Sequence, residues 1–224
     1  MLVKLKSKDY YQVLFRKAYS DTEITEARLQ ECLAQFLRSI QSFDSKYDAG
    51  RATAINDGIP FANFTPQENS GKNLFIQPPQ FLPGSQGVRT GGGAGCGLCH
   101  RPPEFDIDPN SRNNGVIGRI GGGTDLTITR SPTLRDMVRV DGTLNSPLMH
   151  TGAMDLLTMI DHYNNGVVAT GNTNLDNRLR PQGNVQNLQL TQAEKDALFA
   201  FFRTLAGTHV YTDARWSDPF KSDR

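Results

Sequence analysis

Two cysteines and a histidine are spaced so that together they could hold one prosthetic group. Cys96-Gly97-Leu98-Cys99-His100 fits the C-x-x-C-H pattern that attaches a c-type haem. Two thiols at this spacing can form thioethers to the two vinyl groups of one porphyrin, and the imidazole of His100 can bind the iron. The sequence therefore predicts one covalent haem c held by Cys96, Cys99 and His100.

Two other kinds of site use a C-x-x-C pair, and the rest of the chain favours neither. A zinc site needs a second pair of Cys or His ligands at short spacing, and the only other cysteine is Cys32, far upstream. A thioredoxin-like redox pair needs a βαβ context, whereas the flanks here are rich in Gly and Pro. Cys32 lies beside an apolar helical face, which predicts a buried free thiol.

Charge and hydropathy narrow the class of partner and the compartment. The chain of 224 residues has 24 Lys and Arg against 23 Asp and Glu, a balance that does not indicate nucleic acid or an anionic membrane surface. No apolar run is long enough to span a bilayer. Haem is attached to C-x-x-C-H outside the bacterial cytoplasmic membrane, which predicts a periplasmic protein. Residues 1–15 have no signal-peptide pattern, so we expect a piece of a longer exported precursor.

Helical patterns recur between long loops. Residues 9–19 and 25–41 are predicted helices, and the second has an apolar face of Leu29, Leu33, Phe36, Leu37 and Ile40. Helices are also predicted over 65–75, 155–164 and 191–207, with a Thr at the N-cap of the first and a capping box at the start of the last. The glycine run at 91–95 predicts a flexible loop beside the haem. The predicted fold is mainly α, a haem domain with long loops.

The order of these motifs resembles a known family, the bacterial di-haem cytochrome c peroxidases, a group that includes MauG. The resemblance covers most of the chain. It lies in ITEARLQECLAQFLRSIQSFDSKYDAG (24–50), TPQENSGKNLF (65–75), CGLCH (96–100), SPTLRD (131–136), PLMHTG (147–152), DLLTMIDHYNNG (155–166) and LTQAEKDALFAFFRTLAG (190–207).

The resemblance implies a domain organisation. Residues 65–224 resemble the C-terminal, cytochrome c-like domain, which in this family receives electrons at its haem. Residues 1–64 are helical and resemble the end of the N-terminal domain, whose haem reacts with hydrogen peroxide in the family. This chain has a single C-x-x-C-H, so the peroxide-reacting haem would belong to a part outside it.

The resemblance also implies a sixth ligand for the iron. The family takes this ligand from the segment that matches DLLTMIDHYNNG, as Met in the typical peroxidases and as Tyr in the MauG type, and the matching residue here is Tyr163. A phenolate favours ferric iron, whereas a thioether favours ferrous iron. Met149, Met154 and Met159 are rival ligands, and Tyr163 as a simple core aromatic is the other alternative. His162 is expected to face solvent or a loop.

Further residues are candidates for contacts with the haem or with calcium. Arg135 has the planar fork of donors that suits a haem propionate, or it is an exposed arginine without a partner. His150 resembles a family histidine close to the haem, and it is expected to donate a hydrogen bond or contact a propionate. The resemblance implies a calcium ion bound partly by backbone oxygens of Asn145 and Pro147. His209 is expected at the surface.

Three functions follow from these predictions. The first is the electron-transfer haem domain of a di-haem peroxidase, which takes electrons from a cytochrome c or a small copper protein for the reduction of hydrogen peroxide; its MauG-like variant oxidises a protein substrate. The second is a one-haem electron carrier without catalysis. The third is a haem-free or zinc-holding structural domain. The family's homodimer is a further expectation from the resemblance.

Overall fold

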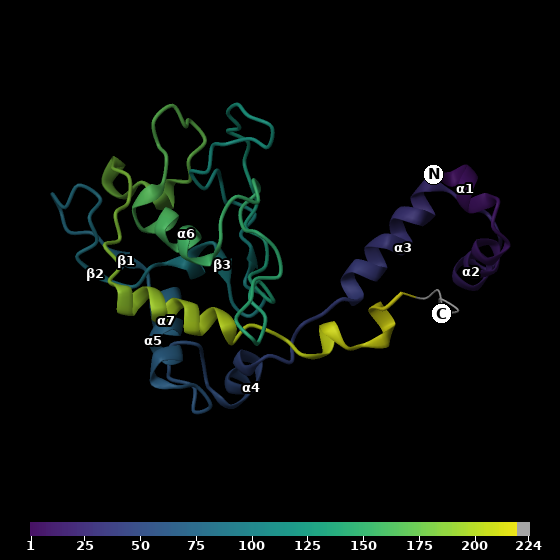
Figure 1. Ribbon diagram of the computed structural model, residues 1–224, viewed down its shortest axis with the longest axis horizontal. Coiled ribbons are helices and arrows are strands. Elements are labelled where there is room, and N and C mark those ends of the chain that lie inside the picture. The colour runs from purple at the N-terminus through teal and green to yellow at the C-terminus, as the bar shows by residue number, and fades with distance from the viewer. Residues whose placement is uncertain (219–224) are drawn as a thin grey trace. The chain divides into compact units, whose positions relative to one another are not determined.

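The computed structural model describes residues 1–218 and is mainly helical (Figure 1). The α-helices are α1 (Leu2–Lys6), α2 (Asp9–Tyr19), α3 (Glu26–Ser39), α4 (Lys46–Thr53), α5 (Pro66–Ile76), α6 (Leu156–Asp161) and α7 (Gln192–Arg203). A π-helical turn, η2 (His162–Gly166), follows α6 directly, and 3₁₀ turns are η1 (Cys96–Leu98), η3 (Asn177–Leu179), η4 (Pro181–Gly183), η5 (His209–Tyr211) and η6 (Ala214–Trp216). Two antiparallel pairs join β1 (Pro79–Gln80) to β2 (Gly91–Gly92) and β3 (His100–Arg101) to β4 (Asp106–Ile107).

The chain folds into two compact units, and the larger one contains the C-x-x-C-H motif. One unit consists of residues 1–41 and the described residues from 213 onward, and the other consists of residues 42–212. The predicted boundary after residue 64 separates the parts of the chain that resemble the two domains of the family, and it stays a prediction. Among residues 1–218, no helix has the length and apolar character needed to cross a bilayer.

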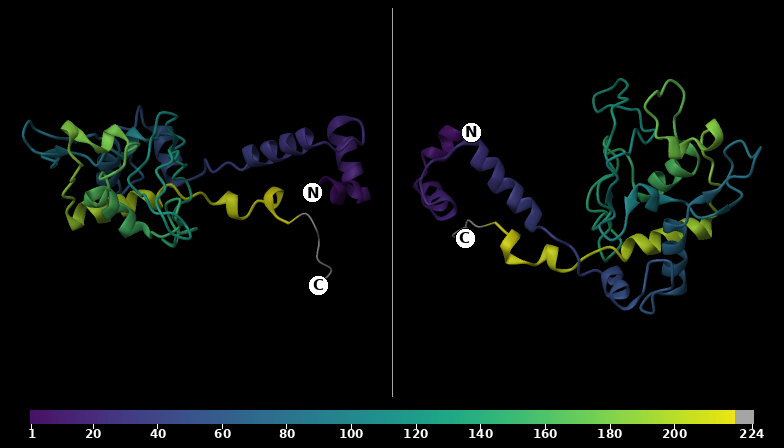
Figure 2. Two further views of the ribbon diagram at one scale, coloured as in Figure 1. Left: turned by 90° about the horizontal axis from the view of Figure 1, so that it is seen from above. Right: turned by 180° about the vertical axis from the view of Figure 1, so that it is seen from behind.

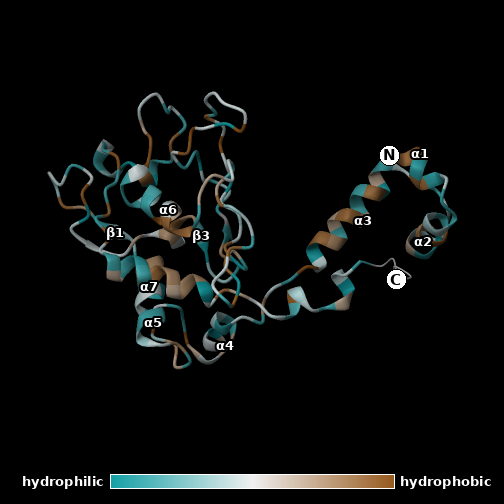
Figure 3. Ribbon diagram, viewed as in Figure 1, coloured by the Kyte–Doolittle hydropathy of each residue, from teal (hydrophilic) through white to brown (hydrophobic). Residues whose placement is uncertain are grey.

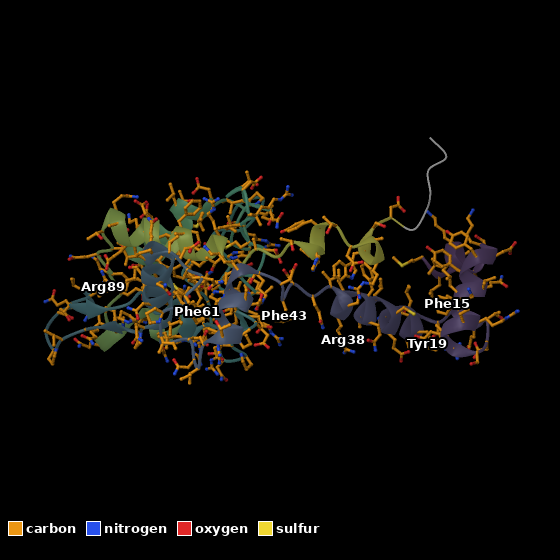
Figure 4. The ribbon with its side chains drawn as sticks, turned by 90° about the horizontal axis from the view of Figure 1, so that it is seen from below. Phe15, Tyr19, Arg38, Phe43, Phe61 and Arg89 are labelled. Atoms are coloured by element: carbon orange, nitrogen blue, oxygen red, sulfur yellow. The ribbon has the colours of Figure 1, made fainter. Side chains whose placement is uncertain are left out.

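The smaller unit contains the first two predicted long helices. Thr25 caps α3 by accepting a hydrogen bond from the backbone N–H of Arg28 at 3.2 Å, as an N-cap threonine should. Phe15 and Tyr19, one turn apart on α2, stack with ring centroids 5.8 Å apart (Figure 4). These contacts order the unit locally, and the predictions of helices over 9–19 and 25–41 are confirmed.

The apolar face of α3 exists as predicted, but its side chains are exposed in the described structure. Leu33, Phe36 and Leu37 are 52%, 47% and 66% exposed, and apolar residues recur along the helix (Figure 3). Cys32 is free but only half-buried, with its Sγ 3.5 Å from the hydroxyl of Tyr19. The prediction of full burial for Cys32 is therefore wrong, because α3 buries none of its residues.

The larger unit is built around an aromatic core. Tyr47 of α4 is completely buried, and its ring meets the ring of Phe105 edge-on at 4.8 Å. Aromatic pairs of this kind stabilise a core beyond the area that they bury. Helix α4 lies between the helices predicted over 25–41 and 65–75, and a capping box between Ser45 and Asp48 starts it. The other large aromatic residues of this cluster are Phe61, Phe64, Phe75, Phe201 and Phe202.

Helices α5 and α7 pack against each other and form the base of the larger unit (Figures 1 and 2). Capping boxes at Thr65 and Thr191 start the two helices, as the sequence predicts. Gly71 lies where the two helices meet. A Cβ atom at this position would lie 1.9 Å from the carbonyl oxygen of Ala197 and 2.9 Å from the Cβ of Phe201. The absence of a side chain at Gly71 is therefore what permits the close approach.

Replacement of Gly71 by Ala is expected to lower the free energy of unfolding by about 1–3 kcal/mol, because α5 must move away from α7. The measurement is urea unfolding of the haem-loaded protein. Gly58→Ala is the matched control, since Gly58 is exposed and its added Cβ would meet only the flexible end of Asn56 at 3.1 Å. A G71A protein as stable as G58A would contradict the packing described here.

Long loops and α6 occupy one side of α7 (Figure 1). The loops of residues 101–155 and 167–190 contain few regular elements, and most of their order comes from turns and side-chain hydrogen bonds. A capping box between Asp155 and Thr158 starts α6, which buries Leu156, Met159 and Ile160. This arrangement places the end of α6 and the C-x-x-C-H motif around one cavity.

Candidate haem site

The C-x-x-C-H motif begins on a tightly packed turn. Gly95 precedes Cys96 with a φ of +72°, and a Cβ at Gly95 would lie 2.6 Å from the ring of Pro79. Gly93 lies equally close to the end of α5, because a Cβ there would meet the carbonyl oxygens of Gln77 and Leu74 at 2.3 and 2.5 Å. The glycine run therefore allows close packing around the motif, and its flexibility stays a prediction.

His100 presents one ring nitrogen to the protein and leaves the other available. Its Nδ1 lies 3.0 Å from the carbonyl oxygen of Pro132 and 3.3 Å from that of Phe105. Carbonyl oxygens only accept, so Nδ1 carries the proton and Nε2 keeps its lone pair. Burial lowers the pKa of His100, which favours the neutral ring. A neutral imidazole held through Nδ1–H is the form in which histidine binds metals.

The two thiols of the motif are free and protonated in the folded chain. Burial raises the pKa of Cys96 to about 12, and burial also raises the pKa of Cys99 to about 11. Arg178 supports this part of the motif by donating to the carbonyl oxygen of Leu98 at 2.8 Å. The same guanidinium pairs with Asp176 and with the buried Asp108. The motif is therefore anchored by a charged network that sequence reasoning missed.

A cavity of about 550 Å³ brings the predicted residues together. This volume lies in the range of small-molecule and cofactor sites, which are mostly apolar with a few placed polar groups. All six predicted site residues line the cavity: Cys96, Cys99, His100, Arg135, His150 and Tyr163. Its apolar wall includes Leu134, Met137, Leu148, Ile160, Leu198 and Phe202.

One residue of the wall, Ser111, has a buried hydroxyl. This hydroxyl has no hydrogen-bond partner within the described protein. Buried polar atoms usually have a partner. An apolar wall, an available imidazole nitrogen and two thiols fit a porphyrin that is attached through its vinyl groups. These residues therefore fit haem c.

Tyr163 reaches the cavity from the π-helical turn η2. Turns of this kind often mark functional sites, because the inserted residue redirects the side chains that follow α6. The backbone carbonyl of Tyr163 accepts a hydrogen bond from Nε2 of Gln186 at 2.5 Å, which fixes the turn. Burial raises the pKa of the Tyr163 hydroxyl, and an interaction with the side chain of Asn114 opposes the rise. Without a metal, Tyr163 is a neutral phenol.

The neighbouring histidine turns away from the cavity. His162 is 7% exposed, and its Nε2 lies 2.9 Å from the carbonyl oxygen of Asn114. The sequence predicted that His162 faces solvent or a loop, and the structure confirms that it faces a loop. The buried ring connects η2 to the loop that contains Asn114.

Two of the three rival methionines line the cavity. Met159 is buried on α6, and Met149 follows Leu148 with a φ of +64°, a left-handed conformation that is uncommon for a residue other than glycine. Met154 is half-buried against the core and is absent from the described lining. Met149 and Met159 therefore remain rivals of Tyr163.

Arg135 lines the cavity, but its guanidinium is engaged elsewhere. It forms a bidentate pair with Asp48 at 2.7 and 2.9 Å, and it donates to the carbonyl oxygens of Pro103 and Ser42. All five N–H groups have acceptors, so a propionate contact would require breaking this pair. The alternative of an exposed arginine without a partner is wrong, because the side chain is 6% exposed.

The remaining predicted residues lie at the rim. His150 is exposed and its Nε2 lies 3.1 Å from the carbonyl oxygen of Gly118, to which it donates. Asn145 and Pro147 line the cavity as well. The described residues contain no group of three or more His, Cys, Asp and Glu side chains that could hold a metal ion, and the calcium site stays a prediction. His209 is exposed and pairs with Asp44, in agreement with its predicted place at the surface.

Sequence and structure comparisons identify the relatives of this chain. The sequence model of the family described as di-haem cytochrome c peroxidase matches residues 1–54. The "Methylamine utilization protein MauG" of Methylophilus methylotrophus is 26% identical over 92% of this chain and 55% of its own length. The "Cytochrome c551 peroxidase" of Nitrosomonas europaea is 24% identical over 88% of this chain and 49% of its own length. The chain thus spans about half the length of these relatives.

A solved structure has the same fold. The crystal structure of a MauG-like protein associated with microbial copper homeostasis superposes with a TM-score of 0.55 and 23% sequence identity, over 92% of this chain and 65% of that one. The predicted fold class, a mainly helical cytochrome c-like fold with long loops, is confirmed. In sequence, the chain is similar to the di-haem cytochrome c peroxidase and MauG family of oxidoreductases.

Proposed function

We propose that this chain is the electron-transfer haem domain of a peroxidase-like oxidoreductase. One haem c would be attached to Cys96 and Cys99, with His100 and Tyr163 as the iron ligands. The observation that carries the proposal is that the C-x-x-C-H motif and Tyr163 line one apolar cavity. Electrons would come from a cytochrome c or a small copper protein and pass toward hydrogen peroxide at a second haem outside this chain.

Each side chain of the site has a defined task in this proposal. When bound, the haem supplies a one-electron couple between ferric and ferrous iron. The carbonyl oxygens of Pro132 and Phe105 accept the hydrogen bond from Nδ1–H of His100. This contact orients the ring and makes Nε2 a stronger ligand. Tyr163 would serve as the iron ligand in its phenolate form. The apolar wall would limit access of water to the bound group.

The broader assignments are proposals of the same kind. We place residues 65–224 in the cytochrome c-like domain and residues 1–64 at the end of a preceding peroxidase domain. We also propose a periplasmic location, a calcium ion at Asn145 and Pro147, and a homodimer. Two alternatives compete with peroxide reduction: a one-haem electron carrier, and a MauG-like enzyme that oxidises a protein. The similarity to MauG and the tyrosine at position 163 favour the MauG-like alternative over the carrier.

Tyr163→Phe tests the ligand assignment in protein exported together with haem-attachment machinery. The ferric absorption bands should change, and the reduction potential should rise by on the order of 0.1 V, because loss of a phenolate destabilises ferric iron. Tyr10→Phe is the matched control, since Tyr10 is exposed on α2 outside the cavity.

Peroxide turnover separates the functional alternatives in the same preparation. The haem-loaded chain should exchange one electron with a reduced small cytochrome. Addition of its peroxidase partner domain should then permit oxidation of that cytochrome by hydrogen peroxide. Electron exchange without any peroxide turnover in the complete protein would favour the one-haem carrier. A ferric spectrum that is the same in Y163F and in the wild type would overturn the assignment of Tyr163 as ligand.

A further inference from the structure

Asn114 lies between two side chains that can each bind iron. It lines the cavity together with Tyr163 and Met149. Its Nδ2 donates to the sulfur of Met149 at 3.5 Å, and its side chain also interacts with the hydroxyl of Tyr163. Its Oδ1 accepts from the backbone N–H of Val116 at 3.0 Å, which fixes the orientation of the carboxamide. The donor end of Asn114 therefore engages one candidate ligand, Met149, in the cavity that the other, Tyr163, also lines.

The backbone of Asn114 is held against the segment that carries Tyr163. The buried ring of His162 donates from Nε2 to the Asn114 carbonyl oxygen at 2.9 Å, and the rings of His162 and Tyr163 meet edge-on at 5.1 Å. The next residue, Gly115, has a φ of +85°, and a Cβ there would lie 2.7 Å from Val167. The loop is thus fixed next to η2 on both sides of the carboxamide.

Met149 is held in the cavity by an unusual backbone conformation. Its φ of +64° lies in the left-handed region, and its carbonyl oxygen accepts from the N–H of Gly152 at 3.0 Å to close a turn. Residues other than glycine adopt this conformation mainly where the surrounding structure imposes it, and such residues cluster at functional sites. The Met149 thioether is therefore a placed group rather than a surface side chain.

The two donors prefer opposite oxidation states of iron. A phenolate oxygen is a hard ligand that favours ferric iron, and a thioether is a soft ligand that favours ferrous iron. A hydrogen bond to the Met149 sulfur occupies electron density that the sulfur would otherwise offer to a metal. A hydrogen bond to the Tyr163 oxygen, by contrast, stabilises the charge of a phenolate and orients it, as partners of metal ligands commonly do.

We propose that Asn114 is a positioning residue that selects the sixth ligand of the haem, because its carboxamide holds the Met149 sulfur back and leaves the iron to Tyr163. The inference rests on the proposed function, in which Tyr163 binds the iron. In the wild-type protein, Tyr163 as the ligand would give the haem a low reduction potential. Without the carboxamide, the Met149 sulfur would be free to compete as a ligand, and a thioether competes best for ferrous iron.

Asn114→Ser is the variant that tests the selection. A serine hydroxyl can still accept from the N–H of Val116 and preserve the turn, but its shorter side chain withdraws the donor from the Met149 sulfur. In the haem-loaded protein, the ratio of ferrous to ferric haem at a fixed applied potential should rise at least tenfold, which is 59 mV for one electron. Asn184→Ser is the control, since Asn184 is an exposed carboxamide outside the cavity.

Met149→Leu identifies the competing ligand. Alone, M149L should retain the wild-type spectrum, because Tyr163 remains the ligand. Combined with N114S, it should remove the ferrous bands that the single N114S variant gains. Loss of the tyrosine-ligated spectrum in M149L alone would overturn the proposal, and this measurement remains decisive even if N114S does not load haem.

The outcomes also separate this inference from the assignment of Tyr163. If Y163F alters the ferric spectrum while N114S leaves spectrum and potential unchanged, the ligand stands and the role of Asn114 is overturned. If Y163F leaves the ferric spectrum unchanged, the assignment of Tyr163 as ligand and the role of Asn114 are both overturned. If N114S shifts the potential but M149L does not reverse the new ferrous bands, Met149 is not the competitor and the selection is overturned.

Discussion

Replacement of both Cys96 and Cys99 by Ser is expected to abolish covalent attachment of haem. Each thioether needs one of these sulfurs, and a hydroxyl cannot substitute for either. His100 alone would leave at most a dissociable haem, which denaturation removes. The measurement is haem staining of the denatured protein after gel electrophoresis, together with the intact mass. The stain should fall to background in the double variant.

Cys32→Ser provides the control for this prediction. Cys32 lies in the smaller unit next to Tyr19, and it is not one of the residues that line the haem cavity. C32S should stain as strongly as the wild type. Persistent stain in the double cysteine variant, or its loss in C32S, would contradict the assignment of the motif. A colourless wild-type protein that instead contains zinc would support the structural alternative, although zinc needs four ligands and the described residues hold no matching cluster.

Loss of Arg135 is expected to destabilise the folded protein by about 3–5 kcal/mol, because it leaves the carboxylate of Asp48 without its charged partner in the interior. The side chains of Arg135 and Asp48 are only 6% and 19% exposed, so solvent screens the pair weakly. Arg135→Met and Asp48→Asn should each lower the free energy of unfolding in urea, and the double variant should lose less than the sum. Arg38→Met is the control, on an exposed residue of α3 (Figure 4).

The same pair predicts a response to acid. Burial alone would raise the pKa of Asp48, but hydrogen bonds from Arg135 and Ser45 outweigh burial and lower it below its ordinary value. A carboxylate with a lowered pKa contributes stability that is complete above its unfolded pKa of about 3.9 and is lost as pH falls through the folded value. Wild-type protein should therefore lose more stability below about pH 4 than D48N. Equal losses of stability with falling pH in the wild type and D48N would favour contact of Arg135 with a haem propionate. A haem spectrum that changes in R135M without loss of stability would favour the same contact.

Arg135 also shows where sequence reasoning reaches its limit. The pattern around it indicates only an arginine suited to a carboxylate, and the carboxylate that it meets is 87 residues away on α4. Helix α4 itself was missed because its Gly and polar residues hide the apolar period, although Ser45 and Asp48 form the capping pattern three residues apart.

Local patterns were the reliable part of the prediction. The capping residues Thr65 and Thr191 begin their helices as expected, because a cap depends only on the next three residues. The C-x-x-C-H motif is equally local, whereas the candidate role of Tyr163 came from a family resemblance. No sequence signal marks Asn114, since its partners Met149 and His162 meet it only after the loops have folded.

The raised pKa of the two thiols bears on when haem is attached. A thiolate is the form that attacks a double bond or an electrophile, and burial disfavours the thiolates of Cys96 and Cys99 in the folded chain. In an unfolded chain the same thiols have ordinary acidity. Both side chains remain half-buried at the wall of the cavity, so the folded chain still presents them to a haem. We therefore expect attachment to proceed faster before folding is complete than in the folded, haem-free chain.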